Sequence, residues 1–185
     1  MWGIKVFFVY TPRRVNCPSC GIRVEQMPWV NGKYRLTNAY SWFLAGWAKR
    51  LSWKEVGEAF HTTWYHVFFS VHIAVTWGLE HRELFGIQAI GINEIQWRRG
   101  HHYLTLVYRI DAGCRRLLWI GKSTVVAQLV SGQRPILQWH RRGLEQESKT
   151  HDRKAYGFRT YHSTEIALYH ALGNLPVPES THKFF

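Results

Sequence analysis

The sequence predicts an α+β protein with three parts in order along the chain. An extended stretch with a Cys-x-x-Cys turn comes first, apolar side chains at helical spacing follow from about residue 37, and β-branched strands follow residue 86. Spacings of three and four residues indicate helices, whereas runs rich in Val, Ile, Thr and Tyr indicate strands. We therefore place the predicted domains at residues 1–34, 35–84 and 85–185.

The composition is that of a folded, basic protein. The chain has 185 residues, enough for one ordinary domain or two small ones. Hydrophobic residues make up 46% of it and ten residues are Trp, so it has the apolar surface needed to offset chain entropy. Its 24 Lys and Arg against 12 Asp and Glu give a formal charge of +12. This charge favours a polyanionic partner, and double-stranded DNA is the leading candidate.

The first ten residues do not predict a secretory signal. They are apolar, but Lys5 interrupts them and no small-residue cleavage site follows. No apolar run approaches the roughly 18 residues that span a bilayer. We expect a soluble cytoplasmic protein with no membrane partner.

Cys17 and Cys20 form a tight Cys-x-x-Cys knuckle, which is half of a zinc ribbon. Structural zinc takes four Cys or His ligands, and the second Cys-x-x-Cys of a ribbon is missing. A His or a neighbouring chain would have to complete a zinc site at Cys17 and Cys20. The alternative is a reduced turn with two free thiols. Cys114 stands alone and is expected to be a small buried side chain.

Residues 37–51 predict a first helix. Thr37 is its expected N-cap, and the helix is expected to end at Leu51 and Ser52. Side chains three and four residues apart place one apolar face toward a core, and these are Tyr40, Phe43, Leu44 and Trp47.

A capping box predicts the start of a second helix. The Ser52 hydroxyl would accept a first-turn amide, and Glu55 would reach back to the Ser52 amide. Gly57 would allow another helix to cross closely, and the short helix is expected to end at His61. Its predicted apolar face is formed by Val56, Ala59 and Phe60.

A third helix is expected to begin at Thr62 or Thr63 and to run towards Glu80, which completes a helix-turn-helix. The second helix of such a pair enters the major groove with its first turns. The predicted base contacts are Thr63, Tyr65 and His66, with Phe69 and Ser70 as further candidates. The predicted phosphate contacts from neighbouring segments are Lys49, Arg50 and Lys54. With no Arg, Asn or Gln among the base contacts, sequence specificity should be weak. The alternative is a small three-helix bundle.

Extended segments follow Gly86, with a hairpin tip at residues 98–100. Arg98 and Arg99 at this tip are further candidate phosphate contacts, although a charged hairpin tip is also a common solvated turn. A last helix, capped by Ser163 and stopped after Gly173, is expected to pack with an apolar face of Ile166, Tyr169 and Leu172.

Several stretches resemble the ISL-three type of bacterial insertion-sequence transposases, which belong to the Asp-Asp-Glu class. They are residues 17–29, 51–56, 78–82, 103–120, 153–161 and 165–173. The resemblance implies a zinc ribbon, a helix-turn-helix for the transposon ends and a ribonuclease-H-like domain. In the family that domain cuts and joins DNA with two divalent metals held by three carboxylates. The strands after Gly86 would be its opening hairpin and third strand.

The chain departs from the family at the first two carboxylate positions. Asn93 stands at the first Asp, and its amide is a neutral ligand where hard Mg²⁺ takes charged oxygens. Glu94 cannot replace it, because neighbours on a strand point to opposite faces. The region of the second Asp is missing between Gly121 and about Ile136, so the ribonuclease-H-like sheet is expected to be truncated by an internal deletion.

The third carboxylate position is also changed. Alignment without gaps places Arg142 at the family's Glu, and Glu145 or Glu147 would need a register shift of three or five residues. A shift of three stays near the same helical face, but Glu145 would still lack partners. No catalytic residue is therefore assigned, Asn93 and Arg142 are degenerate positions, and the Mg²⁺ site is expected to be lost.

The predicted function is binding of transposon-end DNA by an inactive transposase remnant, which could repress a complete relative. One alternative is an accessory or active subunit in transposition, as a homo-oligomer or together with full-length transposase. Another is a non-functional gene fragment with a poorly covered sheet edge.

Overall fold

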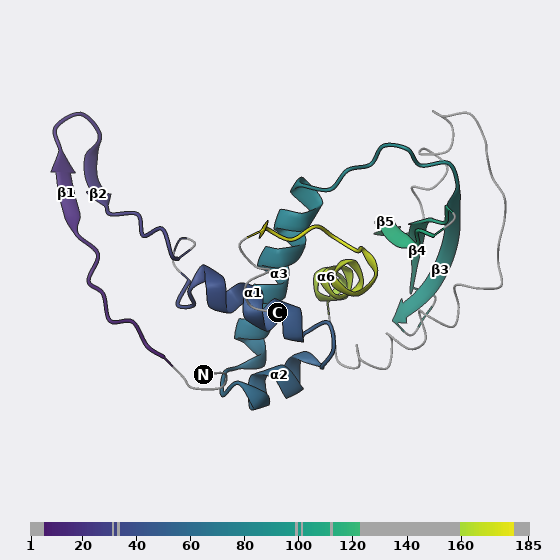
Figure 1. Ribbon diagram of the computed structural model, residues 1–185, viewed down its shortest axis with the longest axis horizontal. Helices are drawn as coiled ribbons and strands as arrows, with labels where there is room; N and C mark the ends of the chain where they lie inside the picture. Colours follow the sequence, from purple (N-terminus) through teal and green to yellow (C-terminus); the bar gives the residue numbers. More distant parts are fainter. Residues whose placement is uncertain are drawn as a thin grey trace. The chain divides into compact units, whose positions relative to one another are not determined.

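The computed structural model in Figure 1 describes residues 6–30, 32, 34–98, 100, 102–111, 113–122 and 160–179. These residues form helices and two antiparallel sheets, so the α+β prediction is confirmed at this level. The chain divides into two compact units, Met1–Ile73 with Pro178–Phe185 and Ala74–Val177. The first unit holds a two-stranded ribbon, two helices and the start of a third helix. The second holds the end of that third helix, a three-stranded sheet and one further helix.

Strands β1 (Arg14–Cys17) and β2 (Gly21–Val24) form the two-stranded ribbon. The strands are antiparallel, with Arg14 opposite Val24 and Cys17 opposite Gly21. Gly21 has φ +74°, a left-handed conformation that suits glycine at the end of the turn. The predicted Cys-x-x-Cys knuckle therefore lies at the tip of a β-hairpin.

Glu25 and Tyr10 close the open end of this ribbon. The Tyr10 hydroxyl donates a hydrogen bond of 2.7 Å to the Glu25 carboxylate, which also accepts the Arg13 amide at 3.2 Å. The Tyr10 ring meets the edge of Trp29 with a centroid separation of 5.5 Å. A two-stranded hairpin is only marginally stable through its own backbone hydrogen bonds, and these contacts add to its stability.

Helix α1 (Asn38–Trp47) begins where it was predicted and ends earlier. Thr37 caps it by accepting the Tyr40 amide at 3.2 Å. After Trp47 the backbone hydrogen bonds join residues three apart: the Lys49 amide donates to the Gly46 carbonyl, and the Arg50 amide donates to the Trp47 carbonyl. The prediction of a helix up to residue 51 is therefore wrong by about one turn, because the tightened turns close the helix early.

Helix α2 (Trp53–Ala59) has the predicted capping box. The Ser52 amide donates to Glu55 at 2.7 Å, and the Glu55 amide donates to the Ser52 hydroxyl at 3.3 Å. The predicted apolar face is wrong at one position: Ala59 is exposed, while Val56 and Gly57 are buried.

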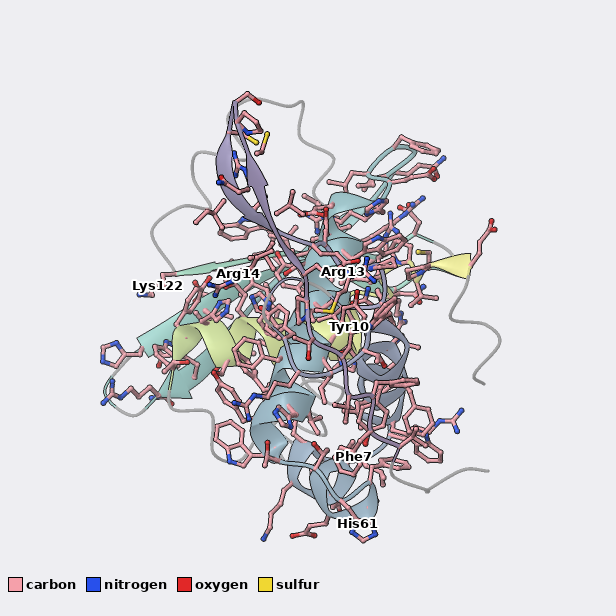
Figure 2. The ribbon with its side chains drawn as sticks, turned by 90° about the vertical axis from the view of Figure 1, so that its left-hand side faces the viewer. Phe7, Tyr10, Arg13, Arg14, His61 and Lys122 are labelled. Atoms are coloured by element: carbon pink, nitrogen blue, oxygen red, sulfur yellow. The ribbon has the colours of Figure 1, made fainter. Side chains whose placement is uncertain are left out.

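Gly57 explains how α2 meets helix α3 (Trp64–Glu80). A Cβ at Gly57 would lie 3.1 Å from the Thr62 carbonyl oxygen and 3.2 Å from the Trp64 nitrogen. Between the helices, His61 has φ +50° and is labelled in Figure 2. A small residue at position 57 thus lets the turn and the start of α3 approach α2 closely.

The helices share an aromatic and aliphatic core. The Phe43 and Phe60 rings meet edge to face at 4.8 Å, and the Tyr40 hydroxyl donates to the Phe60 carbonyl at 3.2 Å. That bond caps the end of α2 from α1. The fully buried aliphatic side chains of this core are Leu44, Val56, Val67 and Val71.

Strands β3 (Ile90–Arg98), β4 (His102–Arg109) and β5 (Arg116–Lys122) form an antiparallel sheet in the order β3-β4-β5. Its first hairpin turns at residues 98–102, where the sequence predicted the tip. Helix α6 (Tyr161–Leu172) packs on β5 (Figure 1). Its N-cap is Thr160, which accepts the Ser163 amide at 3.2 Å, so the prediction of Ser163 as the cap is wrong by three residues.

Three arginines form hydrogen bonds that connect residues 82–86 to the sheet. Arg82 donates to the Leu118 carbonyl at 2.6 Å, Arg109 donates to the Gly86 carbonyl at 2.6 Å, and Arg116 donates to the Glu83 carbonyl. Each guanidinium satisfies a backbone oxygen. These positive charges are therefore part of the fold and add little to a free basic surface.

Candidate nucleic-acid interface

The first turn of α3 presents two of the three predicted base contacts. Thr63 is exposed and acts as N-cap, since its hydroxyl accepts the His66 amide at 3.3 Å. Tyr65 is 52% exposed, and its ring rests edge to face on Phe69 with a centroid separation of 4.5 Å. Phe69 therefore packs against the Tyr65 ring, and about half of the Tyr65 side chain stays exposed.

His66, the third predicted contact, is half-buried, and one of its ring nitrogens interacts with Thr62. Its Nδ1 lies 3.0 Å from the Thr62 hydroxyl. That interaction fixes the ring and leaves Nε2 as the ring nitrogen available to a ligand.

The two further candidates on α3 differ in exposure. Ser70 is 1% exposed, and its hydroxyl donates to the His66 carbonyl at 2.8 Å, so it cannot reach a ligand. Phe69 is half-buried between Tyr65 and Tyr34, whose ring centroid is 5.4 Å away. The prediction that Ser70 faces a ligand is wrong, whereas Phe69 stays a candidate that also packs on Tyr65.

Trp64 is the side chain of this turn that sequence reasoning missed. It is 59% exposed and meets Tyr65 edge to face at 6.1 Å. The available signal was its place as the first helical residue, where no preceding turn of the helix covers the side chain. Trp64 and Tyr65 together form an exposed aromatic pair at the start of α3.

The predicted phosphate contacts of the helical unit are exposed. Lys49 and Arg50 follow α1, and Lys54 opens α2. The side chain of Lys54 is 83% exposed and lies 3.8 Å from Glu58, an i,i+4 pair that solvent screens strongly. Arg98 is exposed at the end of β3, and Arg99 lies outside the described residues.

Cys17 and Cys20 interact at the tip of the ribbon. Side-chain hydrogen bonds from Cys20 and then Ser19, whose hydroxyl is 3.2 Å from the Cys17 sulfur, lower the pKa of Cys17 to about 6. The thiolate is the form that binds metal or reacts. The described residues contain no cluster of three or more His, Cys, Asp or Glu able to hold a metal ion. The pair thus supplies two of the four ligands that zinc requires.

The chain is similar to the transposases for insertion sequence element IS1557 from two strains of Mycobacterium tuberculosis, CDC 1551 / Oshkosh and ATCC 25618 / H37Rv. Each is 33% identical to it over 122 residues, which is 64% of this chain and 27% of the relative. This similarity supports a transposase family. The chain thus spans about a quarter of the length of these curated relatives. No family model matches the chain, and no solved structure matches it.

The surroundings of Asn93, the position expected to have lost a metal-binding carboxylate, decide whether a divalent metal fits there. Asn93 lies in β3 opposite Leu106, and its side-chain oxygen accepts the Glu94 amide at 2.9 Å. Its side-chain nitrogen is buried and has no hydrogen-bond partner in the part of the chain that the structure describes. A buried N–H donor beside this position repels a cation, so the described residues do not fit a divalent metal here.

Asp111, an acidic residue that follows β4, uses its carboxylate to hold the fold and is not free to bind a metal. Its carboxylate accepts the Ala89 amide at 2.6 Å, the Gln88 amide at 3.1 Å and the Arg109 guanidinium. Partial desolvation raises the pKa of Asp111, but these hydrogen bonds outweigh it and lower the pKa overall. Arg142, Glu145 and Glu147, the residues considered for the third carboxylate position, lie outside the described residues.

None of the helices among the described residues is long and apolar enough to cross a membrane.

Proposed function

We propose that the chain binds duplex DNA at the ends of an insertion element through the start of α3 and does not cut it. The observation that carries this proposal is the exposed first turn of α3, where Thr63, Trp64 and Tyr65 face solvent on a helix whose other side is buried. The similarity to transposases supplies the context, because such proteins act on element ends.

The helix start is held rigidly, which a DNA-reading helix requires. Gly57 admits the turn close to α2, and the Tyr40 hydroxyl fixes the Phe60 carbonyl at the end of α2. The Thr62 and Thr63 side chains both bond to His66. α2, the turn and the first turn of α3 thus act as one preorganised helix-turn-helix, and little conformational entropy is lost on binding.

Positive charge supports the same role. Lys49, Arg50 and Lys54 are exposed in the helical unit, and the whole chain carries a formal charge of +12. Exposed cations bind phosphates and release counterions. Arg98, exposed at the end of β3, and Arg99 are proposed as further phosphate contacts.

The absence of cutting rests on Asn93. The neutral amide of Asn93 replaces a carboxylate that two-metal chemistry requires, and the Asp111 carboxylate is bonded by Arg109 and two amides. We infer that the chain is an inactive remnant of an ISL-three transposase with an internally deleted ribonuclease-H-like domain. Such a remnant would occupy element ends and repress a complete relative.

The test is binding of the full chain to a fluorescent duplex that carries the terminal repeat of a complete related element, with a scrambled duplex beside it, across a salt series. We expect Trp64→Ala and Tyr65→Ala each to weaken binding to the true end about tenfold. Stacking or groove contact by one aromatic side chain is worth about that much. The matched control is Phe85→Ala, since Phe85 is an aromatic residue 73% exposed outside α3.

Unchanged affinity in both α3 variants would overturn the assignment of α3. Equal and steeply salt-dependent binding to both duplexes would show that only net charge acts, as in a gene fragment without function. Mg²⁺-dependent nicking by purified protein would instead favour an active subunit in transposition.

A further inference from the structure

The β1–β2 ribbon exposes side chains on both of its faces. Among the eight strand residues, only Cys17 is even half-buried. Val15 is 59% exposed, Ile22 is 72% exposed and Val24 is 58% exposed. A sheet that served only as structure would bury one face. Both faces of this ribbon are therefore available to a ligand.

The register separates the ribbon into two chemically different faces. Residues directly opposite each other on antiparallel strands share a face, and alternate residues of one strand share it too. Arg14 pairs with Val24 and Asn16 pairs with Ile22, whereas Val15 pairs with Arg23. The first face, here called the Arg-Asn face, consists of Arg14, Asn16, Ile22 and Val24. The opposite face carries Val15, Cys17 and Arg23.

The two strands of the ribbon carry two positive side chains, Arg14 and Arg23, and no negative one. Arg14 and Arg23 form no ion pair with any described residue. Glu25, at the end of the ribbon, is occupied by the Tyr10 hydroxyl and the Arg13 amide. Figure 2 labels Arg13 and Arg14, the residues through which the chain enters β1. A second copy of this ribbon would bring like charges together, whereas a polyanion matches them.

The Arg-Asn face also carries the side chains that distinguish bases. Arginine forms paired hydrogen bonds with guanine, asparagine does so with adenine, and apolar groups contact the thymine methyl. The major groove, about 12 Å wide, admits a two-stranded ribbon. The first turn of α3 holds Thr63, Trp64, Tyr65 and His66, none of which makes the paired contacts of Arg, Asn or Gln.

We propose that the β1–β2 ribbon is the element that reads DNA sequence, with its Arg-Asn face directed at base edges in the major groove. The ligand is duplex DNA, with guanine opposite Arg14 and adenine opposite Asn16. α3 then contributes affinity and position, and the ribbon contributes discrimination. This inference rests on the proposed binding of duplex DNA.

The experiment is selection of bound duplexes from a library with a randomised central segment, followed by sequencing. It uses the full chain, the variants Arg14→Gln and Asn16→Ala, and Arg23→Gln as a matched control from the opposite face of the same ribbon. Arg14→Lys is a further variant, since lysine keeps the charge and loses the guanidinium fork. Circular dichroism checks that every variant is folded.

We expect the wild-type chain and Arg23→Gln to select the same motif. Arg14→Gln and Arg14→Lys should lose the guanine preference at one base pair, and Asn16→Ala should lose an adenine preference, each by about tenfold in discrimination. An unchanged motif in all these variants would overturn the inference, and so would a wild-type chain that binds without selecting any motif. A wild-type chain that binds no duplex would overturn the proposed function itself.

Discussion

The two antiparallel sheets of this protein are built alike and covered differently. In the β3–β4–β5 sheet, Leu104, Leu106 and Leu117 are at most 1% exposed. In the β1–β2 ribbon, the apolar Val15, Ile22 and Val24 are all more than half exposed. One sheet contributes to a hydrophobic core, and the other offers its side chains to solvent.

The buried sheet therefore contributes to the stability of the fold, whereas the exposed ribbon leaves its side chains free to contact a ligand. Burial of apolar area stabilises the three-stranded sheet and commits its apolar side chains to packing. Arg82 and Arg109 are likewise committed, because each donates a hydrogen bond to a carbonyl oxygen. The ribbon gains little from burial and is fastened at its open end by Tyr10 and Glu25. Surfaces that contact a ligand are drawn from such weakly buried elements.

The largest expected effect comes from the core of the three-stranded sheet. Leu106 is fully buried and lies opposite Asn93 and Ile120. Leu106→Ala should lower the free energy of unfolding by about 3 kcal/mol, from lost transfer energy and a cavity. Ile22→Ala in the ribbon, where the side chain is 72% exposed, should change it by less than about 0.5 kcal/mol. Urea unfolding measures both, and equal effects would contradict the comparison.

A smaller effect on stability is expected at Asp111, whose carboxylate binds the amides of Gln88 and Ala89 just before β3. The hydrogen bonds from Arg109 and the amides of Ala89 and Gln88 lower the pKa of Asp111 despite partial desolvation. A carboxylate whose pKa is lowered on folding stabilises the fold at pH values above its pKa in the unfolded chain, about 3.9. That stability is lost as the pH falls through the pKa in the folded chain. Asp111→Asn should therefore lower the melting temperature at pH 7.

The pH dependence provides the control for Asp111. The difference in melting temperature between the wild-type chain and Asp111→Asn should shrink as the pH falls below about 4, because the wild-type carboxyl is then protonated. A difference that stays constant down to pH 2 would show that the carboxylate charge is unimportant.

In the ribbon, the sharpest measurable property is thiol reactivity. Cys20 and Ser19 hydrogen bonds lower the pKa of Cys17 to about 6. Alkylation of Cys17 by iodoacetamide, followed by mass spectrometry, should therefore rise with pH with a midpoint near 6 and level off by about pH 7. Cys20→Ala removes the first of these donors and should raise the midpoint. The same midpoint in a urea-unfolded chain would mean that the turn has no influence.

The smallest effect on stability is expected at Lys54, whose pair with Glu58 is highly exposed. Lys54→Ala should change the free energy of unfolding by less than about 0.5 kcal/mol. In the binding assay it should reduce the slope of log affinity against log salt by about 0.9, the contribution of one phosphate contact. Glu58→Gln is the control for loss of the pair alone, and it should leave that slope unchanged or slightly steeper.

Local signals in the sequence were sufficient for the helix starts. Thr37 and the capping box of Ser52 and Glu55 were recognised because a cap joins a side chain to a backbone amide two or three residues away. The start of the third helix was predicted at Thr62 or Thr63, and α3 begins at Trp64 with Thr63 as its cap. The strands after Gly86 and the hairpin tip at residues 98–100 were also predicted, since β-branched runs and turn residues are local features.

Positions that depend on distant packing were less predictable. Ala59 fits the periodicity of α2 but is exposed, because the buried face of α2 turns toward the start of α3 at Gly57. Thr160 replaced Ser163 as the cap of α6. Among the candidate contacts, exposed Tyr65 followed from its place in the motif, whereas buried Ser70 and exposed Trp64 did not.

By itself, the sequence determined the α+β class, the order of the elements and the basic charge, because composition, periodicity and residue identity are carried by each residue and its neighbours. Only the tertiary structure decided that Arg82, Arg109 and Arg116 bond to carbonyl oxygens, whereas Arg14 and Asn16 share an exposed face. The physical reason is that burial and pairing depend on residues distant in sequence, and identical side chains become structural or available according to what lies opposite them.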